Sequence, residues 1–258
     1  MAKKWIAFPH PDKSYAYDAA GLKKAWPRLH RSDCEPLPKD AAVLDAWRHY
    51  HAGAFADAVA AGRKAGGPGI NAAVKAQMIY ANYLEQAAAA KLALLEEAAG
   101  WADARRHEAP KDANAHYLYA YALGRYSQGI SITKALAQGF GGKVKDALTT
   151  ALKLEPKHAD AHTAFGSYQA EIIDKVGGLV AGMTYGAKKD SALEHYQKAL
   201  KLNPDSAVAR IEYANGLIML VGKARMAEAE KLYQEAAAMK PADAMERLDV
   251  ELARSELE

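Results

Sequence analysis

Apolar residues recur every three or four positions along most of the chain, which is the spacing of an α-helix with one buried face. The pattern is clearest in residues 190–204, where Ala192, Tyr196, Ala199 and Leu200 fall on one face. Small alanines beside a bulky tyrosine predict a face that another helix approaches closely. Runs of β-branched residues are scarce, so the sequence predicts an all-α protein.

The same helical pattern recurs nearer the C-terminus, at Ala229, Tyr233, Ala236 and Pro241. Residues 151–156 also align with residues 199–204, and both stretches end in proline, which cannot continue a helix. Four prolines bound these units: Pro110, Pro156, Pro204 and Pro241. Successive prolines are 46, 48 and 37 residues apart. We therefore expect an array of related helical units of unequal length.

These units resemble the helix pairs of tetratricopeptide repeat (TPR) proteins, whose period is about 34 residues. The resemblance covers residues 41–241 and divides them into five units: 41–70, 71–110, 111–156, 157–204 and 205–241. Its motif residues are strongest in the last two units. The resemblance implies a right-handed α-solenoid of helix-turn-helix repeats.

Two central units are about 12 to 14 residues longer than the standard period. The surplus lies between the two helices of each unit, in residues 127–142 and 175–188. We interpret each surplus as an extended first helix or an added short helix, closed by an aromatic-glycine turn at Phe140-Gly141 or Tyr185-Gly186. These long units are similar to those of TPR-like proteins of the regulator-of-microtubule-dynamics type.

Both ends of the array are expected to carry helical caps, because a repeat array otherwise exposes its terminal apolar faces. Residues 1–40 hold five prolines and one predicted helix, from Ser14 to about Trp26. Four apolar residues of this segment are expected to cover the first repeat: Tyr15, Leu22, Trp26 and Leu29. Residues 242–258 are acidic and polar, and they predict a C-terminal capping helix.

The resemblance implies that the first helices of the repeats line a concave groove for a peptide or protein segment. Transferred onto this sequence, the groove positions are Asn114, Tyr117, Tyr121, Arg125, Thr163, Ser167, Glu171, Ile211, Asn215 and Met219. Related domains that clamp a C-terminal carboxylate use several lysines and asparagines at such positions, and here only Asn215 fits. We therefore do not expect a carboxylate clamp.

Residues 176–183 are the most unusual stretch, because three glycines fall within six residues of an apolar segment. Each glycine inside a helix costs about 1 kcal/mol relative to alanine, so a compensating reason is required. One interpretation is close helix packing, which small residues permit. The other is an apolar groove or pocket beside the insert, formed by Val176, Gly177, Gly178, Leu179, Gly182, Met183 and Tyr185.

Charge and composition narrow the classes of function. The formal net charge is +3 and the basic residues are spread among acidic ones, so no nucleic-acid partner is expected. No apolar stretch reaches the ~18 residues of a membrane span. The start lacks the long apolar core of a secretory signal, and the single cysteine, Cys34, cannot form an intramolecular disulfide. We expect a cytoplasmic location, with the choice between monomer and homo-oligomer open.

No catalytic group or metal site stands out from the helical background. His158, Asp160 and His162 have a metal-ligand spacing, but a third ligand and the glutamate of an HExxH motif are missing, which favours solvated residues at a helix start. Residues 139–143 contain three glycines and a lysine. They lack the residues that precede the lysine in a phosphate-binding loop, and Val144 stands where that loop has a serine or threonine hydroxyl. A glycine turn that starts a helix is the simpler interpretation. The sequence therefore predicts no enzyme activity, no cofactor and no metal.

We interpret the chain as a non-enzymatic TPR scaffold or adaptor that holds a protein or peptide partner in its concave groove. The alternative is a carrier that binds a small apolar ligand beside residues 175–188. The two differ in what occupies the inner face of the solenoid.

Overall fold

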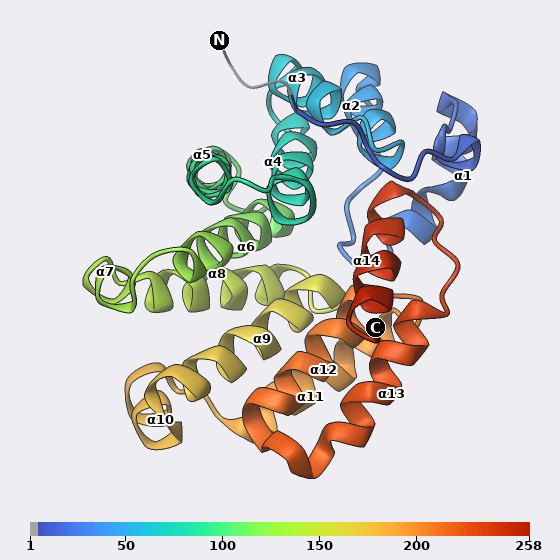
Figure 1. Ribbon diagram of the computed structural model, residues 1–258. Helices are drawn as coiled ribbons and strands as arrows, with labels where there is room; N and C mark the ends of the chain where they lie inside the picture. The colour runs from blue at the N-terminus through green and yellow to red at the C-terminus, as the bar shows by residue number, and fades with distance from the viewer. Residues whose placement is uncertain (1–4) are drawn as a thin grey trace.

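The computed structural model describes residues 5–258, which form helices joined by short turns (Figure 1). No strand is present in these residues. The first half contains a 3₁₀ turn (Lys13–Tyr15), α1 (Ala19–Leu29), α2 (Ala41–His51), α3 (Phe55–Ala65), α4 (Gly69–Ile79), the π-helical turn η2 (Tyr80–Leu84), α5 (Ala88–Glu108) and α6 (Ala113–Gln128). The second contains α7 (Ile132–Ala137), α8 (Phe140–Leu154), α9 (Ala159–Val176), α10 (Gly178–Tyr185), α11 (Lys189–Leu202), α12 (Ala207–Val221), the 3₁₀ turn η3 (Gly222–Arg225), α13 (Met226–Ala237) and α14 (Ala244–Ser255).

Consecutive helices pack against one another along the chain, as expected for helical repeats. None of the helices in the described part of the chain combines the length and the apolar character that crossing a bilayer requires.

The boundary prolines set the start of the next helix as well as the end of the previous one. Glu155 and Asn203, which directly precede two of these prolines, have the extended backbone that proline favours in its predecessor. The residue two positions after each proline caps the following helix with its side chain, and these caps are Asp112, His158, Ser206 and Asp243. Because an N-cap side chain stabilises a helix by about 1 kcal/mol, this spacing fixes where each new helix begins.

The surplus residues of each long unit contain an added short helix, α7 after α6 and α10 after α9. Gly186 ends α10 in the left-handed conformation, so the aromatic-glycine turn is confirmed at Tyr185. In the other unit the left-handed glycine is Gly139, and Phe140 and Gly141 are already the first residues of α8. The predicted turn at Phe140-Gly141 is therefore wrong, because Gly139 reverses the chain one residue earlier and Phe140 is buried in the core.

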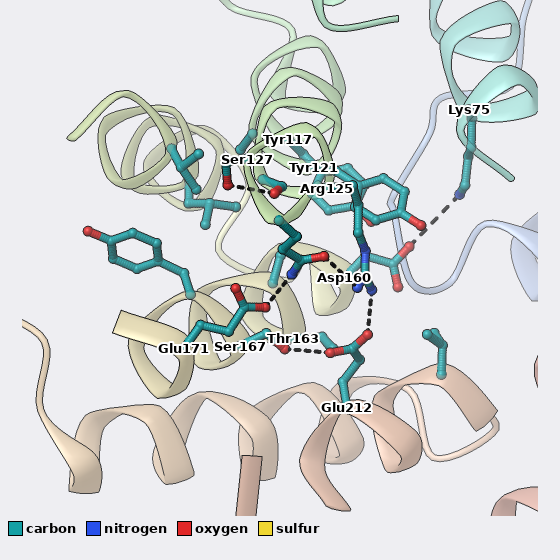
Figure 2. Close-up of a pocket in the computed structure, with 18 of the residues that line it drawn as sticks. Lys75, Tyr117, Tyr121, Arg125, Ser127, Asp160, Thr163, Ser167, Glu171 and Glu212 are labelled. Atoms are coloured by element: carbon teal, nitrogen blue, oxygen red, sulfur yellow. Dashed lines mark hydrogen bonds and ion pairs between the residues drawn. The ribbon is translucent and has the colours of Figure 1, made fainter. Parts of the chain in front are cut away.

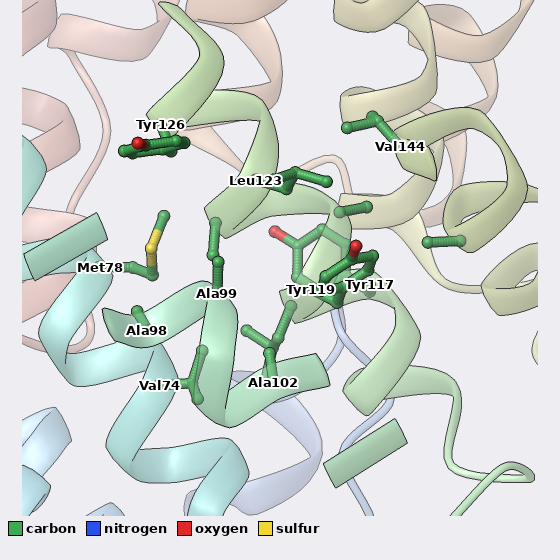
Figure 3. Packing of buried hydrophobic residues seen from close by; sticks show 14 of the residues in the cluster. Val74, Met78, Ala98, Ala99, Ala102, Tyr117, Tyr119, Leu123, Tyr126 and Val144 are labelled. Carbon is green, nitrogen blue, oxygen red and sulfur yellow. The ribbon is translucent and has the colours of Figure 1, made fainter. Parts of the chain in front are cut away.

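Alanines let neighbouring helices approach closely in the central core. Figure 3 shows Val74 and Met78 of α4 beside Ala98 and Ala102 of α5, with Leu123 of α6 in the same cluster. Both alanines are at most 1% exposed. Small residues at a contact shorten the distance between helix axes, and this accounts for the abundance of alanine in the sequence.

Tyr196 of α11 is wedged between α9 and α12, as the sequence predicts, and is 1% exposed. A Cβ atom at Gly166 would lie 3.0 Å from its ring, and one at Gly216 would lie 2.5 Å away, so both glycines make room for the tyrosine. Tyr213 stacks on the ring with centroids 5.2 Å apart. The hydroxyl group of Tyr196 donates to Ser167 Oγ at 3.0 Å, which satisfies its polar end.

The N-terminal cap begins later than the sequence predicts. Asp18 accepts a hydrogen bond from the backbone of Gly21 at 2.6 Å and starts α1 there, so the prediction of a helix from Ser14 to Trp26 is wrong at both ends. Tyr15, Leu22 and Trp26 are buried in one cluster with the residues of the first repeat.

The C-terminal helix α14 covers the first repeat as well as the last one (Figure 1). Ala244 and Leu248 of α14 belong to the same core cluster as Trp47 of α2. Arg28 of α1 and Glu246 of α14 add an ion pair, with Nη1 and Oε1 2.6 Å apart. The two ends of the array therefore meet, and the solenoid closes into a ring.

We expect Tyr196→Ala to lower the free energy of unfolding by about 3 to 5 kcal/mol, because the truncation leaves a cavity between three helices. Urea denaturation followed by circular dichroism measures the change. Lys198→Ala, on the exposed side of the same helix, is the control and should change the value by less than about 0.5 kcal/mol. A loss below about 1 kcal/mol for Tyr196→Ala would contradict the wedge.

Candidate functional site

The ring surrounds a cavity of about 220 Å³ that is partly open to solvent. Its walls come from the inner faces of α6, α9 and α12, from the inserts α7 and α10, and from both ends of the chain. Lys75 of α4 and Asp249 of α14 thus line the same space. Figure 2 shows the polar side chains of the central repeats that point into it.

An ion pair between Arg125 of α6 and Glu212 of α12 spans the cavity wall, with Nη2 and Oε1 2.5 Å apart (Figure 2). Ser167 of α9 donates to the other carboxylate oxygen at 2.9 Å, and Tyr196 donates to Ser167. Burial opposes the charge of Arg125, but Glu212 outweighs this effect and raises the pKa of the guanidinium. The network connects three repeats across the cavity to the tyrosine wedge in the core.

The concave face is partly filled by the chain itself, because residues 30–35 run through it. The side-chain amide of Asn114 donates to the backbone carbonyl of Asp33 at 2.9 Å and to Glu35 Oε2 at 2.7 Å. Its oxygen accepts from Nε2 of the buried His158 at 3.0 Å. Asn114 therefore holds this segment by its backbone.

The following repeats also contact this segment, at Ser32. The backbone N–H of Asp160 donates to the carbonyl of Ser32 at 3.0 Å, and the Asn203 amide donates to the Ser32 hydroxyl at 2.6 Å. Cys34 has a φ of 52°, in the left-handed region that non-glycine residues seldom adopt. Contacts on both sides of Cys34 hold this conformation, so residues 30–35 form a fixed strap across the groove.

Five groups, all buried except the partly exposed Lys75, form a continuous polar chain from α4 through the strap to α14: Lys75, Asp33, His30, His51 and Asp243. Lys75 Nζ lies 2.5 Å from Asp33 Oδ2, and the other Asp33 oxygen lies 2.9 Å from His30 Nδ1. The two rings meet through their Nε2 atoms at 3.2 Å, and His51 Nδ1 lies 2.6 Å from Asp243 Oδ2.

The hydrogen-bond directions fix the charge of this chain. Each carboxylate accepts a hydrogen bond from a ring N–H, and the contact between the two Nε2 atoms needs one further N–H, so the two histidines share one positive charge. Burial lowers the pKa of His30 to about 4, although Asp33 opposes this effect. Although burial alone would raise the pKa of Asp33, His30 and Lys75 hold it well below its usual range. Two positive and two negative charges then balance.

Carboxyl groups outnumber cations on the cavity wall. The carboxyl groups are Asp160, Glu171, Glu212, Asp243, Glu246 and Asp249, and the cations among the lysines and arginines are Lys75, Arg125 and Lys175. Burial raises the pKa of Asp160 to about 6 and also raises the pKa values of Glu171 and Asp249. A positive or hydrogen-bond-donating group placed among them would favour their charged forms.

The part of the cavity beside the inserts is apolar. Its walls include Ile132 and Leu136 of α7, Phe140, Val144 and Leu148 of α8, Ile172 and Val176 of α9, and Tyr185 of α10. The Tyr185 ring lies 2.8 Å from where a Cβ of Gly141 would be, so the end of α10 packs on the start of α8. Tyr168 also lines this part, and its buried hydroxyl has no hydrogen-bond partner among the described residues.

The model of the family described as "Regulator of microtubule dynamics protein 1-3" matches residues 71–257, which is more than half of the chain. The chain belongs to this family. The matched part begins after the strap and includes every helix from α5 onward.

A thermophilic TPR protein of Thermus thermophilus has a similar solved structure, with a TM-score of 0.56 and 17% sequence identity. The likeness covers 83% of this chain and 97% of that one, and it confirms the predicted all-α, TPR-like solenoid. A monomeric mutant of IFIT1 with Gppp-AAAA aligns over 86% of this chain and 56% of its own, at 18% identity and a TM-score of 0.43. No curated protein matches the sequence.

In this family member, six of the ten expected groove residues line the cavity: Tyr117, Tyr121, Arg125, Thr163, Ser167 and Glu171. Asn114 lies on the same face but is covered by the strap. The three positions expected on α12 lie elsewhere. Ile211 is buried in the C-terminal core, Asn215 accepts a hydrogen bond from Tyr233 at 2.5 Å, and Met219 is exposed outside the cavity.

The inner face of α12 is displaced by one residue from the sequence-based register. Val208 and Glu212 line the cavity, because the large aliphatic Ile211 packs into the core instead. Lys75 and Asp249 were also not expected in the site, since they come from the weakest repeat and from the capping helix. Glu212 follows the apolar Val208 by four residues. This spacing is too common in helices to have identified Glu212 as a cavity residue from the sequence.

The expected apolar insert divides between the cavity and the surface. Val176 and Tyr185 line the cavity, whereas Leu179 and Met183 are 79% and 81% exposed. Gly177, with a φ of 79°, separates α9 from α10, and Gly178 and Gly182 lie within α10.

The histidines near the start of α9 are buried, so their interpretation as solvated residues is wrong. His158 is 0% exposed, and its Nδ1 accepts from the backbone N–H of Ala161 as the helix cap. His162 Nδ1 lies 2.8 Å from His195 Nδ1. The strap covers this helix start and excludes water, which the repeat pattern alone gave no reason to expect.

We expect Asn114→Ala to loosen the strap, because the buried Glu35 carboxyl group then keeps only the hydrogen bond from Asn71, and Nε2 of the buried His158 loses its partner. Each such group costs about 1 to 3 kcal/mol, so the free energy of unfolding should fall by about 2 kcal/mol or more. Hydrogen exchange of residues 30–36, read by mass spectrometry, should speed up at least tenfold. Asn215→Ala removes a comparable amide on α12 and should leave exchange in this segment unchanged. Unaltered exchange in Asn114→Ala would contradict the role of this residue.

Proposed function

We propose that the chain is a non-enzymatic carrier that encloses a small amphipathic ligand in its central cavity. The observation that carries the proposal is the division of that cavity into an apolar part and a polar part. The apolar part lies between the inserts, and the polar part lies around Arg125 and Glu212. A ligand with an apolar body and a polar head fits both parts at once.

Closure of the ring favours a small ligand over a polypeptide. An open TPR solenoid offers its whole concave face, but here the strap and α14 occupy much of it. The remaining space has the hydroxyl of Tyr168 on its wall, which has no hydrogen-bond partner among residues 5–258 and is available to bond a ligand. The range matched by the family model includes α7 and α10.

The charges of the wall specify the chemistry of the head group. Lys75 and Arg125 already pair with Asp33 and Glu212, whereas Asp249 accepts only a hydroxyl hydrogen bond, from Tyr83, among the contacts of the described residues. A buried carboxyl with a raised pKa is stabilised in its charged form by a nearby cation. We therefore infer a head group that is cationic or rich in donors rather than anionic.

Isothermal titration calorimetry with dodecylammonium and dodecanoate, below their micellar concentrations, tests the proposal. We expect dodecylammonium to bind at least tenfold more tightly. Ala164→Phe narrows the apolar part and should weaken binding at least tenfold, whereas Ala88→Phe, at an exposed position of α5, should not change it. The proposal fails if neither probe binds and native mass spectrometry finds a clean apo mass after addition of a lipid extract.

A second function rests on the strap. Because Asn114 already binds a peptide backbone, the groove is competent to hold a segment of another protein once the strap leaves. In this role the protein is a scaffold, and the strap competes with the partner segment for the groove. The scaffold function requires displacement of the strap, whereas the carrier function does not.

We expect Asp33→Ala to weaken the strap and open the groove, since it removes the ion pair with Lys75. A fluorescent peptide of residues 28–36, kept reduced, should then bind the variant at least tenfold more tightly than the wild type, as measured by anisotropy. Asp57→Ala removes an exposed carboxylate of α3, away from the strap, and serves as the control. Equal affinity for all three proteins would rule out exchange of the strap.

A further inference from the structure

The two insert helices lie on the same side of the molecule, away from α13 and α14 (Figure 1), and each carries exposed apolar side chains. On α10, Leu179 is 79% exposed, Val180 50% and Met183 81%. On α7, Ile132 is 53% exposed and Leu136 50%. Monomeric proteins seldom gather large apolar side chains at such exposure, and where they do the patch commonly contacts a partner or a membrane. We call these five residues the insert patch.

The charges within the two insert segments are all of one sign. Residues 127–145 and 175–189, which are the insert segments with the first residues that follow them, contain six lysines and no carboxylate: Lys134, Lys143, Lys145, Lys175, Lys188 and Lys189. With the flanking Asp146, Asp174 and Asp190 counted, the two segments carry +3, which equals the formal net charge of the whole chain, so the rest of the chain is neutral. Positive charge is therefore concentrated where the apolar residues are exposed, and this complements a negatively charged surface.

The side-chain types favour a lipid surface over a protein surface. Protein interfaces are enriched in aromatic residues and arginine and depleted in lysine. The insert patch has exposed aliphatic and methionine side chains and contains neither tryptophan nor arginine. Short helices with apolar side chains on one face and lysines at their edges are the pattern of segments that lie in a bilayer interface.

We propose that α7 and α10 dock the protein onto an anionic lipid bilayer, with the insert patch in the interface and the lysines at the head groups. Each lysine near a negatively charged membrane contributes to the attraction. Because Leu136 and Ile132 also line the apolar part of the cavity, docking places that part beside the bilayer. The proposal rests on the exposed surface alone and stands whether or not the cavity binds a ligand.

Flotation with vesicles tests the docking surface. The full chain should float with vesicles of 70% phosphatidylcholine and 30% phosphatidylserine, and at least tenfold less with phosphatidylcholine alone. Leu179→Ser with Met183→Ser should reduce flotation at least tenfold, and so should Lys188→Glu with Lys189→Glu. Salt at 1 M should release the wild type, because it screens the lysines.

Matched controls remove similar residues elsewhere. Leu37→Ser with Met226→Ser replaces exposed apolar residues outside the insert patch, and Lys23→Glu with Lys24→Glu reverses two exposed charges on α1. Both controls should float like the wild type. The proposal is overturned if the wild type stays with the unbound fraction, or if the patch variants float as well as the wild type. It is also overturned if light scattering finds a dimer that depends on Leu179 and Met183 while no vesicle is bound.

Discussion

Packing of α14 against the first repeat is the interaction on which the rest of the structure depends. A solenoid has an apolar face at each end, and separate caps normally cover the two. Here one helix covers both, with Leu248 in the core of the first repeat and Val250 in the core of the last. The closed ring turns the concave face of an open array into an enclosed space.

Enclosure explains why the interior holds so many buried charges. In an open groove, water solvates groups such as Asp33 and His51, whereas inside the ring they must satisfy one another. The chain from Lys75 to Asp243 does this with balanced charges, and it joins α4, the strap and α14. The same groups that neutralise each other therefore also hold the ring closed. Asp249, which has no cationic partner among the described residues, faces the cavity.

Local features of the fold could be read from the sequence, because short-range rules govern them. The boundary prolines and the caps two residues later mark helix starts, and the alanine-tyrosine pattern identifies Tyr196 as a wedge. The closure of the ring could not be read in this way. The amphipathic pattern of residues 244–255 indicates a cap, but nothing local to it specifies contact with residues about two hundred positions earlier.

The candidate site was predictable to the same extent. Positions on α6 and α9 follow from the repeat register, whereas Glu212 depends on how Ile211 packs. The strap resembles an ordinary proline-flanked loop in sequence, and only its tertiary contacts with Asn114 and Asp160 show where it lies. Long-range packing decided each of these points.

The shared helix α14 also has a consequence for how the chain folds. Most repeat proteins can fold unit by unit, since each unit touches only its neighbours. Here the hydrophobic core of the first repeat is complete only when the last helix of the chain has arrived, so its contacts span nearly the whole sequence. Contacts of such separation slow folding because a long loop must close before they form. The two ends of this protein should therefore gain and lose their structure together, as one cooperative unit.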